Sequence, residues 1–154
     1  MGRVFLIVIG LLISQSCSPS MNDTFNSEVL TSSKQEKIYI NTLNWGLIDD
    51  YQISAVSSNE NKVQKRTDTS NVVKGLEPFI YSFENDTLNL YFDGKVSYYI
   101  KEKFKTVHVN YIALNPKGYR AIQGKSYENK DGYHSVPKRK KQDYPSDMPK
   151  PPSN

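Results

Sequence analysis

The chain has 154 residues, with 20 basic side chains, 16 acidic side chains and a single cysteine. One cysteine excludes an intrachain disulfide, and the length suits one domain better than two. The net charge of +4 does not describe a basic body, because residues 18–136 hold 14 basic and 14 acidic side chains. The basic excess lies in the C-terminal tail, so the composition argues against a nucleic-acid-binding face on the folded part.

The first 16 residues have the three parts of a secretory signal. Arg3 supplies the positive charge, residues 4–13 are an unbroken apolar run, and residues 14–16 are small or polar. A helix over that run would cross about half of a ~30 Å hydrocarbon layer, so the run is too short to span a membrane. We therefore predict that residues 1–16 are a signal peptide and that the protein is exported.

Cys17 stands at the exit of this segment, between Ser16 and Ser18. A lone thiol is a liability in an oxidising compartment, and lipidation would remove it. The segment resembles the signal of bacterial lipoproteins, in which a cysteine at the cleavage site is diacylated and becomes the mature N-terminus. It departs from that pattern at Ser14, where leucine is typical, and at Gln15, where a small residue is usual.

The resemblance implies that fatty acyl chains, palmitate among them, are attached at Cys17 and anchor the protein to a membrane of the cell envelope. In that family, aspartate after the cysteine retains the protein in the inner membrane. The chain has Ser18 instead, which implies delivery to the outer membrane. The alternative is a secreted or periplasmic protein with an incidental cysteine.

After the anchor, residues 17–36 are mostly polar with isolated apolar positions, which is typical of a flexible tether. Residues 37–120 hold nearly all the pattern of a folded domain, rich in tyrosine, valine, isoleucine and threonine, which favour strands. No sustained helical period appears, and short breaks between strands favour antiparallel pairing. The predicted strands are at about 37–43, 51–57, 71–74, 79–83, 87–92, 95–101 and 104–114.

Three turns set the register of the last four predicted strands. A turn at Asn85-Asp86 pairs Glu84 with Thr87 and places alternate apolar residues of both strands on one face. A three-residue loop at 92–94, with Gly94 left-handed, then keeps that face apolar in the next strand. A turn at 102–103 does the same for the last strand, with Tyr98 opposite Val107 and Val96 opposite Val109. These turns predict a four-stranded antiparallel meander over about 79–114.

A sheet with one apolar face needs a cover, and the earlier strands are the available material. We therefore predict an all-β fold, a small antiparallel sandwich or open barrel. Glycine and proline breakers predict an irregular segment at 121–136. Residues 137–154, with the basic run 138–141 and several prolines, are predicted to be a disordered tail, or a tail that contacts anionic lipid headgroups or polymers.

The other face of the predicted meander is a candidate binding face, because it collects Ile80, Tyr91, Tyr99 and His108. Catalytic and metal-binding patterns are weak. A zinc site needs three or four ligands, whereas the two histidines, His108 and His134, are far apart in the sequence. No cofactor motif is found either.

These observations favour a non-enzymatic envelope lipoprotein that binds a protein or glycan partner. Two alternatives stay open. The first is an inhibitor or immunity protein directed against an envelope-lytic enzyme. The second is a small cell-wall hydrolase, which would carry carboxylates of shifted pKa in a cleft.

Overall fold

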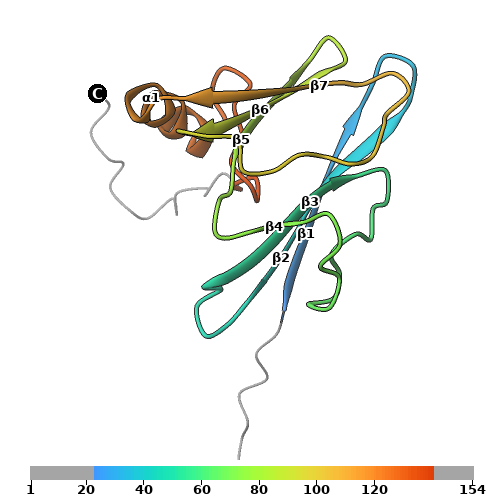
Figure 1. Cartoon of the computed structure of the whole chain (residues 1–154), viewed down its shortest axis with the longest axis vertical. Helices are drawn as coiled ribbons and strands as arrows, with labels where there is room; N and C mark the ends of the chain where they lie inside the picture. The colour runs from blue at the N-terminus through green and yellow to red at the C-terminus, as the bar shows by residue number, and fades with distance from the viewer. Residues whose placement is uncertain (1–22, 141–154) are drawn as a thin grey trace, which may run out of the picture.

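The computed structural model describes residues 23–140, which form two β-sheets and one helix (Figure 1). The predicted signal peptide at 1–16, the anchor at Cys17 and residues 141–154 of the predicted tail lie outside these residues. No helix within 23–140 is both long and apolar enough to cross a membrane.

Sheet A contains four antiparallel strands in chain order: β1 (Thr24–Thr31), β2 (Lys37–Trp45), β3 (Tyr51–Ser57) and β4 (Val73–Lys74). Sheet B contains β5 (Ile80–Glu84), β6 (Thr87–Asp93) and β7 (His108–Leu114). The helix α1 (Pro116–Tyr127) follows β7 and packs against all three strands of sheet B. Figure 1 shows sheet B lying across one end of sheet A, with α1 at the far end of sheet B.

Both sheets contribute to one hydrophobic core, which confirms the all-β, two-sheet prediction. Its fully buried centre is aromatic, with Phe79 stacked on Tyr98 and tilted against Phe92. A smaller cluster lies on the opposite face of sheet A and includes Val63 from the long connection between β3 and β4. The main cluster comprises Ile38, Ile40, Val56, Val73, Phe79, Tyr81, Leu88, Leu90, Phe92, Tyr98, Val107 and Val136.

The predicted hairpin at 79–92 is correct in its register. Glu84 pairs with Thr87, Phe83 with Leu88, and Tyr81 with Leu90. Asn85 and Asp86 both have a positive φ, as the turn between these strands requires.

The predicted four-stranded meander over 79–114 is wrong beyond that hairpin. Residues 95–101 form no strand, and β7 pairs with β6 in parallel, with Leu88 beside Val109. The intervening residues 94–107 cross over the core, where Tyr98 is buried and its hydroxyl accepts a hydrogen bond from the Val56 amide at 3.1 Å. An alternating pattern fixes which side chains face inward but not the direction of pairing, so the parallel arrangement buries the same side chains.

The predicted tether and irregular segments also need correction. Residues 24–31 of the predicted tether are strand β1, an edge strand whose side chains are only partly buried, which explains its weak apolar pattern. Most of α1 lies where the β domain was expected to end and the irregular segment at 121–136 to begin. Its start is an N-cap, because the Asn115 side chain accepts a hydrogen bond from the Gly118 amide and Pro116 opens the helix.

Candidate functional site

The inner face of sheet A, which is turned toward sheet B, changes from apolar to polar along its strands. In β2, Ile38 and Ile40 belong to the core, and the next residues on the same face are Thr42 and Asn44. Antiparallel pairing places further polar side chains of β1 and β3 beside them. We call this surface the polar half of sheet A; it comprises Asn26, Thr42, Asn44, Gln52 and Ser54.

The chain after α1 returns to cover this polar half. His134 forms two backbone hydrogen bonds with Tyr81 of β5, at 2.8 and 2.9 Å, so the returning segment is tied to sheet B. Val136 is fully buried, and its carbonyl oxygen accepts a hydrogen bond from the Gln52 side chain. Residues 134–137 therefore join the two sheets at the end where the inner face of sheet A is polar.

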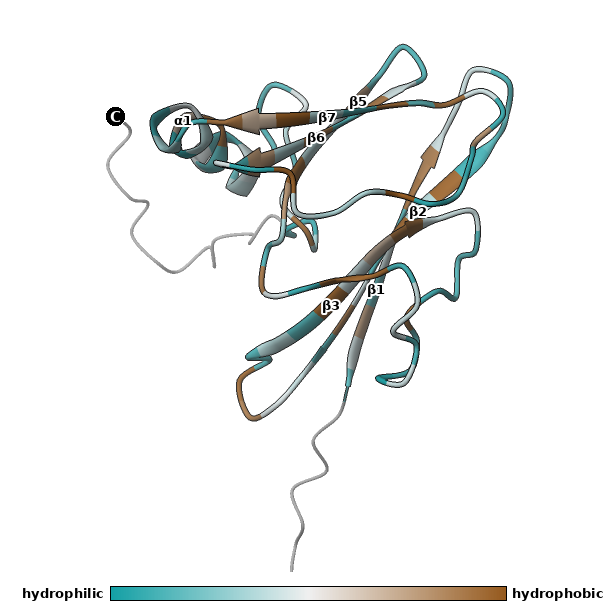
Figure 2. Cartoon of the chain, viewed as in Figure 1, coloured by the Kyte–Doolittle hydropathy of each residue, from teal (hydrophilic) through white to brown (hydrophobic). Residues whose placement is uncertain are grey.

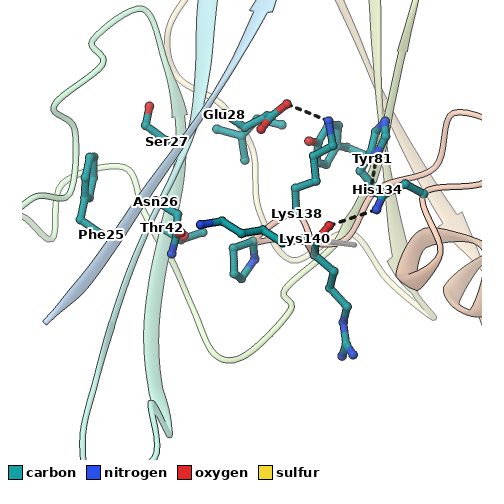
Figure 3. A pocket seen from close by; sticks show the side chains of 13 residues that line it. Phe25, Asn26, Ser27, Glu28, Thr42, Tyr81, His134, Lys138 and Lys140 are labelled. Carbon is teal, nitrogen blue, oxygen red and sulfur yellow. Dashed lines mark hydrogen bonds and ion pairs between the residues drawn. The ribbon is translucent and has the colours of Figure 1, made fainter. Parts of the chain in front are cut away.

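A cavity remains between the polar half and the returning segment. Its volume is about 780 Å³, and a second hollow of about 530 Å³ adjoins it, sharing Asn26, Pro137 and Arg139 as lining residues. We call the two together the inter-sheet cleft. Figure 3 shows Asn26 and Thr42 on one side of it and Tyr81 and His134 on the other. Each of these two volumes falls within the ~300–1,000 Å³ typical of ligand sites.

Three buried side-chain polar atoms within residues 23–140 have no hydrogen-bond partner, and all three belong to residues that line the inter-sheet cleft. They are Thr42 Oγ1, Asn44 Oδ1 and the Tyr81 hydroxyl. Each of these residues is at most 7% exposed. Leaving a buried polar group unpaired costs about 1–3 kcal/mol, so the fold bears this cost three times at the wall of the cleft.

Two titratable groups of the cleft, Tyr81 and His134, are held in their neutral forms at neutral pH. Burial, reinforced by the nearby Glu28 carboxylate, raises the pKa of Tyr81 far above its ordinary value. Burial lowers the pKa of His134, and Lys138 adds to that effect. The Nδ1 of His134 lies 2.9 Å from the Asn129 side-chain oxygen, an acceptor, so the neutral ring carries its proton on Nδ1 and keeps Nε2 as an acceptor.

Four charged side chains around the cleft form two ion pairs. Lys138 binds Glu28 of β1 at 2.9 Å (Figure 3). Arg139 binds Glu77 at 2.8 Å and lies over the Tyr127 ring, whose hydroxyl donates to the same carboxylate. Two residues of the predicted basic tail thus close the rim of the cleft.

The structure separates the residues of the candidate binding face. Ile80 is buried, with 3% of its surface exposed, so it is not available to a partner. Tyr91 pairs with it across the β5–β6 ladder and packs edge-on against Tyr133. Tyr99 lies on the crossover, exposed and packed against Tyr111, while His108 starts β7. Partner binding by Tyr91, Tyr99 and His108 remains a prediction.

Sequence reasoning missed the inter-sheet cleft, although one signal for it was present. Thr42 and Asn44 continue the inward alternation that Ile38 and Ile40 begin, and polar residues at inward positions are the mark of a site or a buried network. Within residues 23–140, no three side chains of the metal-binding types cluster closely enough to hold an ion.

Comparison with known proteins adds no relative. No family model matches the chain, and neither a curated protein nor a solved structure shows significant similarity to it.

Proposed function

We propose that this protein is an exported, lipid-anchored binding protein of the cell envelope that holds an uncharged, hydroxyl-rich ligand, a glycan, in the inter-sheet cleft. The observation that carries the proposal is that three residues lining that cleft each hold a buried polar atom without a partner. Two of these atoms are hydroxyl oxygens, which donate and accept, and the third is an amide oxygen, which accepts. Sugar hydroxyls both donate and accept, so they match this set.

The electrostatics of the cleft favour an uncharged ligand over a charged one. Its deepest titratable groups, Tyr81 and His134, are neutral at neutral pH. The charged side chains Glu28, Glu77, Lys138 and Arg139 are already engaged in ion pairs at the rim. A charged ligand that bound to these four side chains would have to break those pairs, whereas a neutral ligand leaves them in place.

Binding without catalysis is supported by the carboxylates of the described residues. Glycoside hydrolysis needs one carboxylic acid whose pKa is raised so that it can donate a proton. Among the described residues, a hydrogen bond from Thr106 lowers the pKa of Glu36, and one from Ser33 lowers that of Asp86. Neither of these residues lines the inter-sheet cleft.

The cleft hydroxyls provide the test of glycan binding. Tyr81→Phe and Thr42→Val remove hydroxyls that bond nothing within the protein, so both variants should fold at least as stably as the parent. Each should weaken binding of envelope glycan strands about three- to tenfold, measured by titration calorimetry, because each removes one hydrogen bond. Tyr39→Phe, on the opposite face of β2, is the matched control. If no neutral glycan from the envelope binds the unmodified protein, the proposal is wrong.

The anchor is tested separately, by mass spectrometry of the protein from the membrane fraction. Diacylated Cys17 at the mature N-terminus, and release into the soluble fraction on Cys17→Ser, are the expected results. Ser18 supports recovery with the outer membrane in a double envelope, and Ser18→Asp should redirect the protein to the inner membrane. An unmodified Cys17 in membrane-bound protein contradicts the anchor without affecting the cleft.

A further inference from the structure

We propose that the tip of the β2–β3 hairpin inserts into the membrane leaflet that holds the acyl chains of Cys17, beside this lipid anchor. The inference rests on the proposed acylation of Cys17 and adds a second, apolar contact with the same membrane. It is carried by a cluster of exposed hydrophobic side chains and by the place where the described chain begins.

Large hydrophobic side chains are exposed together at the end of sheet A that carries the β2–β3 turn. Leu47 and Ile48, in the β2–β3 turn, are 81% and 85% exposed. Tyr51 follows at the start of β3, and Leu76 and Ile48 lie together at the outer edge of the smaller hollow of the inter-sheet cleft, which both line. We call Leu47, Ile48, Tyr51 and Leu76 the apolar tip; Figure 2 shows the turn as the brown loop at the end of the β2–β3 hairpin. A contiguous exposed apolar cluster marks a contact surface.

The backbone of the β2–β3 turn holds Leu47 and Ile48, the two most exposed residues of the apolar tip, away from the core. Gly46 has φ +108°, a conformation that favours glycine, and the Asp50 carboxylate folds back so closely that a side chain at Gly46 would collide with it. Trp45 and Tyr51 stack behind the turn with ring centroids 5.8 Å apart. In this conformation Leu47 and Ile48 project into solvent.

The described chain begins beside the apolar tip. Thr24 pairs with Asn44, three residues before Leu47, and Asp23 forms an ion pair with Arg66. The Arg66 guanidinium lies 5.5 Å from the centre of the Trp45 ring, so residue 23 is fixed near the aromatic pair behind the turn. Figure 1 shows the start of β1 and the β2–β3 turn at the same end of sheet A.

The number of residues between the anchor and the domain limits how far apart they can be. Five residues separate Asp23 from Cys17, and the six Cα–Cα steps between them span at most about 20 Å when fully extended. The rise from Thr24 to the turn is about 10 Å along the strands. An acylated Cys17 at the membrane surface thus brings the apolar tip within reach of the same surface.

Apolar burial, not charge, is the expected driving force. Asp49 and Asp50 belong to the turn, and Arg66 and Lys74 lie near it, so neither sign of charge dominates. Insertion should therefore occur in vesicles of phosphatidylethanolamine and phosphatidylcholine without anionic lipid, and added salt should not reverse it. This separates the tip from the basic segment 138–141, whose contact with lipid would depend on anionic headgroups and low salt.

Tryptophan fluorescence tests the proposal, because Trp45 is the only tryptophan of the chain. The acylated full-length protein is reconstituted into such vesicles with bromine on the phospholipid acyl chains, which quenches nearby indoles. We expect quenching of Trp45, and stronger quenching of Ile48→Trp in a Trp45→Phe background. The double variant Leu47→Asn, Ile48→Asn should return Trp45 emission to its level in unbrominated vesicles. Val29→Asn changes an exposed hydrophobic residue farther along β1 and should keep the quenching.

The outcomes distinguish the two proposals. Acylated protein in which neither indole is quenched overturns tip insertion and leaves the anchor intact. Quenching that persists in the double asparagine variant also overturns it. Protein whose Cys17 is unmodified refutes both the anchor and the tip proposal that rests on it.

Discussion

Gln52 shows how single residues maintain the polar half of sheet A. Its side-chain oxygen accepts from Asn44 at 3.2 Å, and its side-chain nitrogen donates to Ser54 at 2.8 Å and to the Val136 carbonyl at 3.2 Å. Gln52 is 4% exposed, so none of these partners has ready access to water if the amide is removed. The residue therefore connects β2, β3 and the returning C-terminal segment.

Replacing this amide should be costly. Gln52→Leu preserves much of the side-chain volume but leaves buried polar partners unpaired, so we expect a loss of about 2 kcal/mol in the free energy of unfolding. Urea denaturation measures it. Gln64→Leu is the control, since Gln64 is exposed and bonds only Asn61, and its change should stay within about 0.5 kcal/mol. Equal stability of the two variants would contradict the role given to Gln52.

His134 makes the stability of the fold depend on pH. Its pKa in the folded chain is lower than the ordinary value of 6.5, mainly through burial, so the unfolded chain binds more protons near and below pH 6.5. Stability should therefore be complete above about pH 6.5 and decline as the pH falls below it. Urea midpoints at pH 7.5, 6 and 5 measure the decline.

His134→Gln should flatten the stability profile in this pH window. A further loss below about pH 4.5 should persist in that variant, because Glu36, whose ordinary pKa is 4.5, has a lowered pKa and becomes protonated there. An unchanged profile between pH 6.5 and 5 in the variant would assign the effect to another group.

At the scale of elements, the predictable parts of the fold are those in which local pattern and local pairing agree. The β5–β6 hairpin is such a case, because a two-residue turn and alternating apolar residues both specify its register. Strand β7 is not, since its Val109 and Tyr111 face the core equally well in parallel or antiparallel pairing. The direction in which β7 pairs depends on the crossover at 94–107. The sequence predicts a strand there because Val96, Tyr98 and Ile100 alternate with other residues.

Helix α1 was missed because its glycines outweighed its start signal. Gly118 and Gly124 lower helix propensity, but Asn115-Pro116 is an N-cap followed by proline at the first turn. Burial of Tyr119 and Ser126 against the rest of the domain then stabilises a helix that the local sequence only weakly favours.

The cap of α1 is open to a direct test. Asn115→Ala removes the acceptor for the Gly118 amide, 2.8 Å away, and should lower the free energy of unfolding by about 1 kcal/mol. Asn115→Asp and Asn115→Ser retain an acceptor and should lose much less. Thermal denaturation followed by circular dichroism compares the three, and an alanine variant as stable as the serine variant would show that the cap contributes nothing.

At the scale of the whole molecule, the folded unit reaches beyond the domain predicted at 37–120 in both directions. Strand β1 precedes it and the segment 133–140 follows it, and Lys138 of that segment pairs with Glu28 of β1. Both additions are partly exposed and rich in polar residues, which is why composition placed them outside. The inter-sheet cleft lies between them, so a prediction that stopped at residue 120 could not have contained it.

The returning segment should therefore be required for folding, although its composition resembles a tail. A chain that ends after Gly132 loses the two backbone hydrogen bonds to Tyr81, the burial of Val136 and the bond from Gln52. Together these contributions are on the order of 4 kcal/mol, a large part of the ~5–15 kcal/mol that stabilises a typical domain.

We expect the chain ending after Gly132 to unfold at much lower urea concentration than the parent, or to lack a cooperative transition. A chain ending after Lys140 keeps every contact described above and should unfold at the parental midpoint. The two truncated chains should also differ in their affinity for the proposed glycan ligand. Pro137, Lys138 and Arg139 line the inter-sheet cleft, and only the chain ending after Lys140 retains them. If the two truncated chains were equally stable, the segment would not contribute to folding, and the cleft would lack the fixed wall on which the proposed glycan binding depends.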